Sequence, residues 1–312
     1  MRIRATVAAV SGALALSAFV VPAAQAADGS SLGKDDIAQA TQAVKQAASH
    51  KAAFSAAPAA DTGTPYAINA TFSNVKINNG KPIVAGTSAK VSVPVTYTVT
   101  HDAGFDLSAS DVWVDVEIYR GSYDDPDNLL FGDDWPTCTD TSSTTSTCKG
   151  TIDVYPDADL ISNADATTWK ADGYVIDWND QDPTSDNIDF SKVGLATQDE
   201  LATTKLQRLS KLTVNAAPEP VKKGQTITVT GKLSRANWED LQYHGYANQS
   251  VKLQFRKKGS NTYTTLKTVK SDSTGNLKTT TKATVDGFFR YSFAGTSTTP
   301  AVNATGDFVD VK

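Results

Sequence analysis

Several residue types are scarce in this 312-residue chain, which has only two Cys, three His and one Met. So few Cys and His residues exclude a Cys/His metal cluster, a c-type haem attachment and a disulfide-dense miniprotein. Glutamate is scarce too, because only four of the 34 acidic residues are Glu and the other 30 are Asp. Since Glu favours helices whereas Asp favours turns and caps, the imbalance predicts strands joined by loops.

Catalytic signatures are also missing. The sequence contains no G-x-S-x-G nucleophile elbow, no H-E-x-x-H zinc motif and no G-x-x-x-x-G-K-[ST] phosphate loop. Beyond the N-terminal region only His101 and His244 are available as bases, and each stands alone in the sequence. A two-carboxylate glycosidase needs a deep cleft, which small sandwich domains rarely provide. We therefore expect a protein that is not an enzyme.

The N-terminus has the pattern of an export signal. Arg2 and Arg4 precede the apolar stretch 7–21, and the small-residue site Ala24-Gln25-Ala26 follows it. A basic region, an apolar core and an A-x-A site predict a secretory signal peptide over 1–26, with a retained N-terminal anchor as the alternative. The apolar run is too short for a confident spanning helix. We expect a mature protein that is secreted, extracellular and not held in a membrane.

The only two cysteines, Cys138 and Cys148, fit that compartment. An isolated pair in an oxidising environment predicts a disulfide. Closing a loop of this size stabilises a fold by roughly 2–3 kcal/mol. The spacing is not C-x-x-C, which argues against a redox-active pair.

Residues 27–63 are rich in Ala, Ser, Gln and Asp. Within them, 35–48 has the composition of a helix, but its apolar positions are mostly Ala and have little to bury. Because an isolated helix of that length is marginal in water, we expect 27–63 to be a flexible leader.

From Tyr66 onwards, apolar residues recur at every second position, which predicts strands. Clusters of Asp, Gly, Asn and Pro separate these runs, as in a β-sandwich, so we expect an acidic sandwich domain over 64–210. The stretch 193–212 leaves helix and strand open, because a capping box at 197–200 favours a helix. The clearest strand candidates are 90–100, 111–120, 150–155 and 174–178.

A second domain is expected to begin near Ser210. Alternation recurs in 226–230, 251–256 and 289–293, and about seven short strands in roughly 100 residues are typical of an immunoglobulin-like (Ig-like) sandwich. We therefore assign 211–312 to a basic Ig-like domain. The predicted fold class is all-β, with two β-sandwich (Ig-like) domains after a signal peptide and a leader.

A family resemblance supports the second domain. The runs that carry it are K-L-T-V-N at 211–215, P-E-P-V-K-K-G-Q-T-I-T-V-T-G at 218–231, V-K-L-Q-F-R at 251–256, F-F-R-Y-S-F-A-G-T-S-T-T at 288–299 and G-D-F-V-D-V at 306–311. They resemble the C-terminal Ig-like domain of actinobacterial secreted proteins. The resemblance covers 205–312 well and the N-terminal half only loosely. It implies export, a bacterial Ig-like fold and no catalysis.

The two halves of the chain carry opposite charge. Residues 27–204 have a net charge of −17 and residues 205–312 a net charge of +10. Three interpretations remain open: two independently solvated surfaces, docking of the basic domain on the acidic one, and capture of an anionic cell-wall polymer or polysaccharide by the basic domain. Nucleic acid is not expected, because the basic residues lack interleaved stacking aromatics.

Two acidic loops are candidates for calcium binding. Calcium prefers six to eight oxygen ligands, which short Asp and Asn side chains on loops can supply. The second loop begins like an EF-hand but lacks its glycine and its final glutamate. The alternative is that these residues only form turns and caps. The candidate ligands are Asp124, Asp125, Asp127, Asp177, Asn179 and Asp182.

One strand face is a candidate for carbohydrate binding. If the valines of 111–120 face the core, Trp113 and Tyr119 face outward beside Asp115 and Glu117. Exposed aromatic rings flanked by carboxylates suit the stacking and hydrogen bonding of sugar rings. The alternative is that a loop, the leader or the second domain covers Trp113.

The function that these features favour is that of a secreted, non-enzymatic extracellular binding or structural protein built from Ig-like modules. A calcium-binding protein that uses the acidic loops is one alternative. A carbohydrate-binding protein that uses the aromatic strand face is the other. Calcium is the only cofactor that the sequence suggests.

Overall fold

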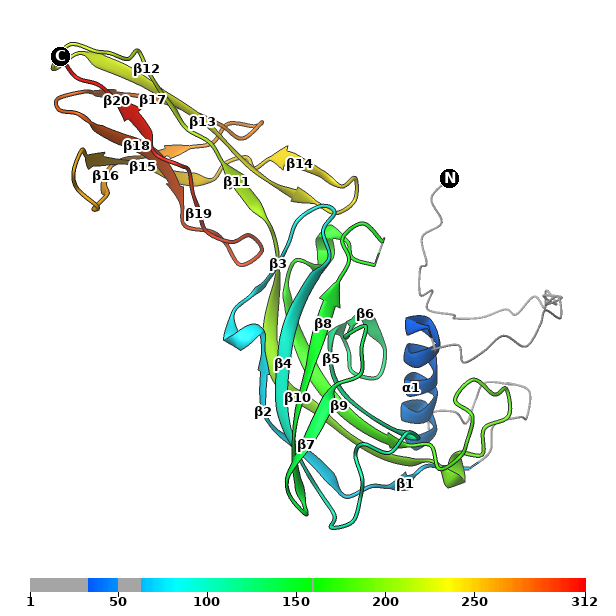
Figure 1. Cartoon of the computed structure of the whole chain (residues 1–312). Coiled ribbons are helices and arrows are strands. Elements are labelled where there is room, and N and C mark those ends of the chain that lie inside the picture. The colour runs from blue at the N-terminus through cyan, green and yellow to red at the C-terminus, as the bar shows by residue number, and fades with distance from the viewer. Residues whose placement is uncertain (1–32, 50–62, 159) are drawn as a thin grey trace, which may run out of the picture. The chain divides into compact units, whose positions relative to one another are not determined.

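A computed structural model of the chain describes residues 33–49, 63–158 and 160–312 (Figure 1). The expected signal peptide, 1–26, lies outside these residues, as do 27–32 and 50–62 of the expected leader. The described part is built almost entirely from strands, with one α-helix, so the all-β sandwich prediction is confirmed. No helix among the described residues is long and apolar enough to cross a membrane.

Two compact units make up the chain. Unit 1 comprises Met1–Lys76, Pro94–Ile152 and Ala171–Ala202, and unit 2 comprises Ile77–Val93, Asp153–Lys170 and Thr203–Lys312. The boundary that we expected near Ser210 lies close to the start of the last segment of unit 2. The division into 64–210 and 211–312 stays a prediction, since unit 2 also contains two earlier segments.

Helix α1, Lys34–Ala48, stands where a flexible leader was expected. Its apolar positions recur every three or four residues and therefore share one face. Ala40 and Val44, on this face, are 5% and 0% exposed and belong to a buried cluster with strand residues. The composition was misleading because small Ala side chains let a helix lie close to a sheet whose own side chains are large.

Two sheets form the layers that contain most of unit 1 (Figure 1). The first has the order β1-β10-β9-β5-β6, with β1 parallel to β10, and the second has the order β2-β4-β8-β7. Short β3 pairs with the end of β10 in unit 2. The strands are β1 Tyr66–Ala67, β2 Ala70–Ile77, β3 Ile83–Ala85, β4 Val91–His101, β5 Val112–Gly121, β6 Pro126–Leu130, β7 Thr137–Ser142, β8 Thr145–Val154, β9 Thr168–Asp177 and β10 Gly194–Arg208.

The ambiguous stretch 193–212 resolves into strands, because β10 runs through most of it. Strand β5 is buried on both of its faces: Val116 is 0% exposed and Glu117, on the opposite face, is 2% exposed. Among the described residues, three short 3-10 helices lie in the loops: η2 Asn78–Gly80, η3 Asn163–Asp165 and η4 Phe190–Lys192.

Unit 2 is dominated by a second sandwich. One sheet has β13 at its centre, paired with β11, β12, β14 and β17, and the other has the order β16-β15-β18-β19 with β20 also on β18. The Tyr291 hydroxyl donates to the carbonyl of Val229 at 2.9 Å and so links the two layers. The strands are β11 Ser210–Leu212, β12 Asn215–Ala217, β13 Thr226–Asn237, β14 Gln242–Gly245, β15 Ser250–Lys257, β16 Thr264–Lys270, β17 Asn276–Lys282, β18 Gly287–Phe293, β19 Val302–Asn303 and β20 Asp307–Val309.

The earlier segments of unit 2 are tied to β13 and the turn after it. The indole Nε1 of buried Trp238 donates to the carbonyl of Gly86 at 2.8 Å. Asn163 donates from its side chain to Asn237 at 2.5 Å and accepts from the Trp238 amide at 3.1 Å. These contacts explain why segments 77–93 and 153–170 cluster with the C-terminal strands.

Candidate functional site

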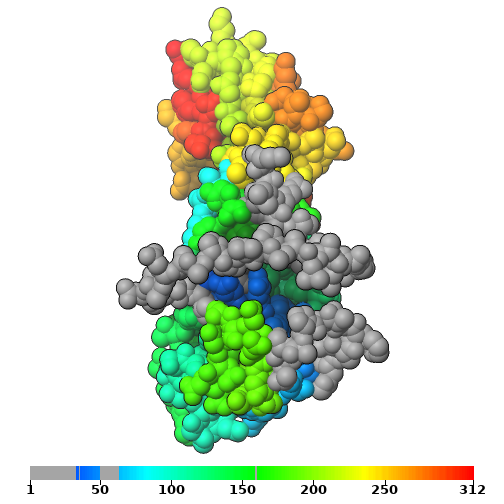
Figure 2. Space-filling view, turned by 90° about the vertical axis from the view of Figure 1, so that its right-hand side faces the viewer, coloured from blue at the N-terminus to red at the C-terminus, as the bar shows by residue number. Residues whose placement is uncertain are grey.

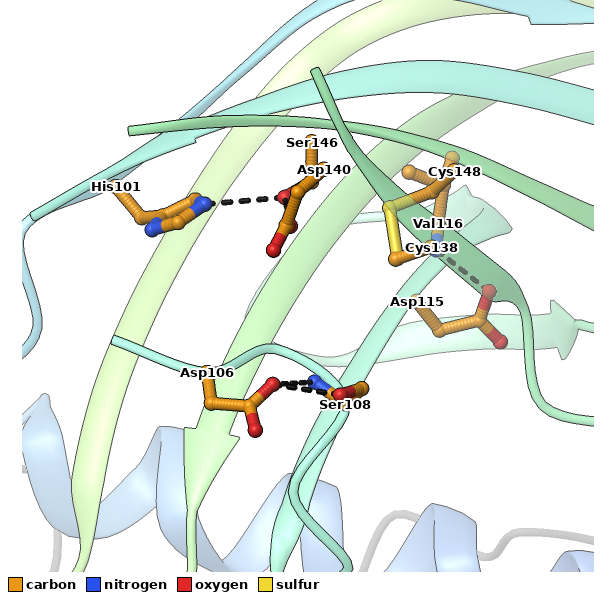
Figure 3. The surroundings of a disulfide bond; sticks show 9 residues. All are labelled: His101, Asp106, Ser108, Asp115, Val116, Cys138, Asp140, Ser146 and Cys148. Carbon is orange, nitrogen blue, oxygen red and sulfur yellow. Dashed lines mark hydrogen bonds between the residues drawn. A yellow bond between two sulfur atoms is a disulfide. The ribbon is translucent and has the colours of Figure 1, made fainter. Parts of the chain in front are cut away.

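The disulfide joins two directly paired strands. Cys138 of β7 lies opposite Cys148 of β8, and their sulfur atoms are 2.01 Å apart (Figure 3). The predicted bond is therefore confirmed. It fixes the hairpin that forms the edge of the second sheet of unit 1.

A chain of His, Ser and Asp side chains lies near this disulfide (Figure 3). His101 Nε2 is 3.0 Å from Ser146 Oγ, which donates to Asp140 Oδ1 at 2.5 Å. In a catalytic triad the imidazole lies between the hydroxyl and the carboxylate, so that it can take the proton of the nucleophile. Here the hydroxyl is in the middle and already gives its proton to the carboxylate. This order of side chains does not activate Ser146 as a nucleophile.

The β5 face that we expected to be exposed lies under α1. Trp113 is 7% and Tyr119 is 2% exposed, so the prediction that both face solvent is wrong. The ring of Trp113 packs against Trp135 and Trp178, with centroid distances of 5.0 and 4.9 Å. The Tyr119 hydroxyl donates to Asp199. The leader covers Trp113, which is the alternative that the sequence left open.

Helix α1 is visible in Figure 2, in blue, beside the light green segment that connects β9 and β10. Its apolar face packs on both this segment and the sheet, where Tyr174, Ile176 and Trp178 of β9 and its end are buried. The exposed aromatic strip that a sugar-binding sheet needs is therefore absent from this face in the described part of unit 1.

A buried charge network lies beneath the C-terminal half of α1. Lys45 Nζ is 2.7 Å from Glu117 Oε1 of β5 and 2.7 Å from Asp172 Oδ2 of β9. The three side chains are 8%, 3% and 1% exposed. The Lys45 ammonium also lies over the rings of Tyr123 and Tyr174, 5.2 and 5.3 Å from their centroids.

Burial shifts the pKa of several groups in this network. Desolvation, with the charge of Glu117 added to it, raises the pKa of Asp172 to about 7 despite the attraction of Lys45. Desolvation also raises the pKa of Asp115, on the same face of β5, well above its ordinary value. For Lys45 desolvation acts to lower the pKa, but attraction to Glu117 and Asp172 outweighs it and the pKa rises.

The first acidic loop does not gather its carboxylates. Asp127 forms an ion pair with Arg120 at 2.8 Å, and Asp125 takes part in a turn through its backbone, whose amide and carbonyl both bond the Ser122 hydroxyl. Asp124 lines a cavity of about 230 Å³ beside Tyr123 and the C-terminal end of α1. The three residues therefore make separate contacts.

The second acidic loop is built from local turns. Asp177 accepts from the Tyr66 hydroxyl at 2.6 Å and from the Asn179 amide at 3.1 Å. Asp182 accepts from the amide and hydroxyl of Thr184, which lowers the pKa of its carboxyl. Among the described residues, no group of three or more His, Cys, Asp or Glu is placed to hold a metal ion. Calcium binding stays a prediction, and the turn interpretation accounts for both loops.

A surface that sequence reasoning missed lies on the outer side of β15 and β18 in unit 2. Buried Val251 and Leu253 alternate with Lys252 and Gln254 on β15. Along β18, Phe288 and Arg290 alternate with buried residues in the same way. The outward residues meet across the strands: Gln254 pairs with Arg290, Arg256 with Phe288, and Phe288 with Phe308 of β20. We call this surface the cationic face, formed by Lys252, Arg256, Lys258, Tyr263, Phe288, Arg290 and Phe308.

Cations and aromatic rings are stacked in pairs on the cationic face. The Arg290 guanidinium carbon lies 3.8 Å from the centroid of Tyr263, and that of Arg256 lies 4.1 Å from the centroid of Phe288. Lys258 Nζ is 5.3 Å from the centroid of Phe308. We argued against nucleic acid on the ground that the basic residues lack neighbouring aromatic rings, and that argument is wrong. The expectation that nucleic acid is not a partner stays a prediction.

Hydrogen bonds fix the orientation of both arginines. Arg290 Nε donates to Gln254 Oε1 at 2.9 Å, and Arg256 donates to the carbonyl of Ser260 at 2.6 Å. The remaining N–H groups of the two guanidinium groups are available to a ligand, because both residues are partly exposed. The cross-strand register brought these residues together, and only the alternation within each strand was visible in the sequence.

The other sheet of unit 2 has lysines on β13 and β17 whose strand partners are Thr and Asn rather than aromatic residues. Lys278 and Lys282 of β17 pair with Thr230 and Thr226 of β13, and Lys232 pairs with Asn276. All three lysines are exposed. We call this surface the lysine–threonine face, and it serves as an internal control for the cationic face.

No protein-family model matches the sequence, and no curated protein matches it. The solved structures with similarity to it are distant. The adhesin InvE of Yersinia pseudotuberculosis is 13% identical with a TM-score of 0.24, over 77% of this chain and 58% of the adhesin. The tandem Ig repeats of Dlar are 9% identical with a TM-score of 0.19, over 78% of this chain and 98% of that one. Dpr2 Ig1-Ig2, in complex with DIP-Theta Ig1-Ig3, is 10% identical with a TM-score of 0.23, over 76% and 98%.

Proposed function

We propose that the chain is a secreted, non-enzymatic binding protein that holds an anionic polysaccharide through the cationic face of unit 2. The observation that carries this proposal is the pair of ring-stacked arginines, Arg256 and Arg290, on the outer side of β15 and β18. The signal-peptide pattern at 1–26 and the disulfide support an extracellular place of action.

Arginine suits this task better than lysine. A planar guanidinium bonds carboxylate or phosphate oxygens through two parallel N–H groups, whereas an ammonium acts as a point charge. Stacking on Phe288 and Tyr263, together with the bonds to Ser260 and Gln254, orders both side chains before a ligand arrives. Less conformational entropy is then lost on binding.

Several cations along one flat face favour a polymer over a single small anion. A repeating polyanion engages Lys252, Arg256 and Arg290 in succession, so each contact raises the local concentration of the next charged group. The partly exposed rings of Phe288, Phe308 and Tyr263 offer apolar contact to sugar rings. Carboxylate-bearing and phosphate-bearing glycans share the charge that this face recognises.

The test measures binding of the full mature chain by calorimetry to polygalacturonate, to a soluble teichoic acid, to uncharged dextran and to single-stranded DNA. The decisive variant is Arg256→Ala/Arg290→Ala, and Lys278→Ala/Lys282→Ala removes equal charge from the lysine–threonine face. We expect the arginine variant to bind an anionic glycan at least about tenfold more weakly, and the lysine variant to stay within about threefold of the native protein. Comparison of polygalacturonate with teichoic acid distinguishes a carboxylate-bearing ligand from a phosphate-bearing one.

Equal losses in the two variants would reduce the interaction to net charge and contradict a specific site. Tighter binding of DNA than of either glycan would contradict the assignment of the polymer. Binding must also weaken as sodium chloride rises, because the contacts are exposed and screened by salt.

A further inference from the structure

The network under α1 contains more buried acid than base. Asp115, Glu117 and Asp172 are 5%, 2% and 1% exposed, and Lys45 is the cation that bonds two of them. A buried carboxylate without a compensating charge is neutralised by a proton, because desolvation disfavours its ionised form. Burial therefore favours the protonated form of the acids in this network while α1 is in place.

Groups from every surrounding element face this network. The acids come from β5 (Asp115, Glu117), β9 (Asp172) and β10 (Asp199), and their charges add to one another at Asp172 and Asp115. The cations are Lys45 and Lys34 of α1, and Lys34 forms an ion pair with Asp133 at 2.6 Å. The phenols are Tyr97 of β4, Tyr119 of β5, Tyr123 after β5 and Tyr174 of β9.

Helix α1 is the element that makes these carboxylates unusual. It supplies Lys45, and its Ala40 and Val44 exclude water from the same face. When α1 lifts, Glu117 and Asp172 regain water and lose the lysine. The regained water lowers the pKa of Asp172, because desolvation is the largest cause of its rise. Seating of the helix is therefore linked to uptake of a proton.

We propose that α1 is a proton-dependent cover, seated on the β5–β9 face while the network holds its proton and lifted from it as the proton leaves. Lifting exposes Trp113, Tyr174 and Trp178, which form the aromatic face under the helix. The cover is independent of the cationic face, since every group that controls it belongs to unit 1.

The direction of the effect follows from the carboxyl of Asp172, whose pKa is about 7 in the folded chain against an ordinary value of 3.8, with desolvation as the largest cause. Between these two pH values the seated form binds more protons than the lifted form. Within this window, each rise of one pH unit lowers the equilibrium constant for seating of α1 by up to about tenfold. Above about pH 7 and below about pH 4 this group adds no further dependence.

The test follows amide hydrogen exchange of the full chain by mass spectrometry from pH 5 to pH 8. Asp172→Asn removes the titrating group at constant shape, and Asp182→Asn makes the same change at an exposed turn of unit 1. The intrinsic rate of amide exchange depends on pH. The ratio of the exchange rates of variant and native protein at each pH cancels this dependence. We expect native α1 to lose protection with rising pH relative to Asp172→Asn, by up to about tenfold per unit below pH 7, and Asp182→Asn to follow the native protein.

A second measurement needs no variant. Acrylamide, a neutral quencher, should reach the tryptophans more readily at pH 8 than at pH 5, because α1 helps to cover Trp113 and Trp178. A pH-independent protection ratio for α1, or quenching that does not change with pH, would overturn the proposal. Simultaneous loss of protection in α1 and β5 would also overturn it, since that pattern describes unfolding of unit 1 rather than a moving cover.

Discussion

Unit 1 and unit 2 each combine aromatic and charged side chains on one sheet face, yet they use the combination differently. In unit 1 the face of β5 and β9 is covered by α1, and Lys45 of the helix bonds both Glu117 and Asp172. In unit 2 the face of β15 and β18 stays partly exposed, and its arginines are stacked on rings rather than paired with carboxylates. The same alternation along a strand thus serves packing in one unit and presents charge in the other.

The largest difference between the units should appear when a cation is removed from each. Lys45→Met leaves two buried carboxylates without their partner and should lower the free energy of unfolding by about 3–5 kcal/mol. Arg256→Met removes a partly exposed cation and should cost less than about 1 kcal/mol. Urea unfolding of the full chain measures both. A loss below about 1 kcal/mol for Lys45→Met would mean that the network does not stabilise unit 1.

Removal of the disulfide should rank next and act on unit 1 alone. Cys138→Ala/Cys148→Ala should lower the free energy of unfolding of unit 1 by about 2–3 kcal/mol, because the open hairpin gains conformational entropy in the unfolded chain. Amide exchange resolves the two units, and β15 and β18 should keep their protection. Loss of protection in unit 2 as well would show that the units unfold together.

The response to pH should have opposite sign in the two units. Because the pKa of Asp172 rises to about 7 on folding, unit 1 should lose stability as the pH increases from about 4 to about 7. In unit 2, backbone N–H groups of Asn276 and Thr274 lower the pKa of Asp272 to about 2. Its contribution is therefore present above about pH 4 and lost as the pH falls towards 2.

Melting curves between pH 2 and pH 8, resolved by amide exchange, check both signs. A parallel rise or fall of the two units between pH 4 and pH 7 would contradict the separate titrations. The variant Asp172→Asn should reduce the slope of unit 1 and leave that of unit 2 in place.

The smallest expected effect is that of calcium. Asp127 is paired with Arg120, and Asp177 and Asp182 accept bonds from neighbouring turn residues, so the described carboxylates of the two loops do not converge. Melting of unit 1 should therefore be equal in millimolar calcium chloride and in sodium chloride of matched ionic strength. A gain specific to calcium that is lost in Asp124→Ala or Asp177→Ala would support the calcium-binding prediction.

Local patterns in the sequence were enough to predict much of the fold. Alternation in 111–120 identified β5 and the two sets of residues on its faces, and the isolated cysteines identified the disulfide. The cover of β5 was not predictable from β5 itself. It comes from a distant helix whose apolar residues are mainly Ala, and the helix binds through its fit to Trp113 and Trp178.

The cationic face depends on pairing between strands. Arg256 and Phe288 are 32 positions apart in sequence and meet only because β15 and β18 pair in one particular register. A shift of one residue would turn the arginines towards the core. The composition predicted that this half of the chain is positively charged. The strand register then places the arginines beside aromatic rings.

The most direct test of the contrast between a covered and an exposed face is a footprint of the bound polymer. Amide exchange of the full chain is compared with and without polygalacturonate at low ionic strength. Added protection is predicted in β15, β18 and β20, with none in α1 or β5 of unit 1 and none in β13 or β17 of the lysine–threonine face. Equal protection of β17, or protection centred on β5, would contradict binding through the ring-stacked arginines.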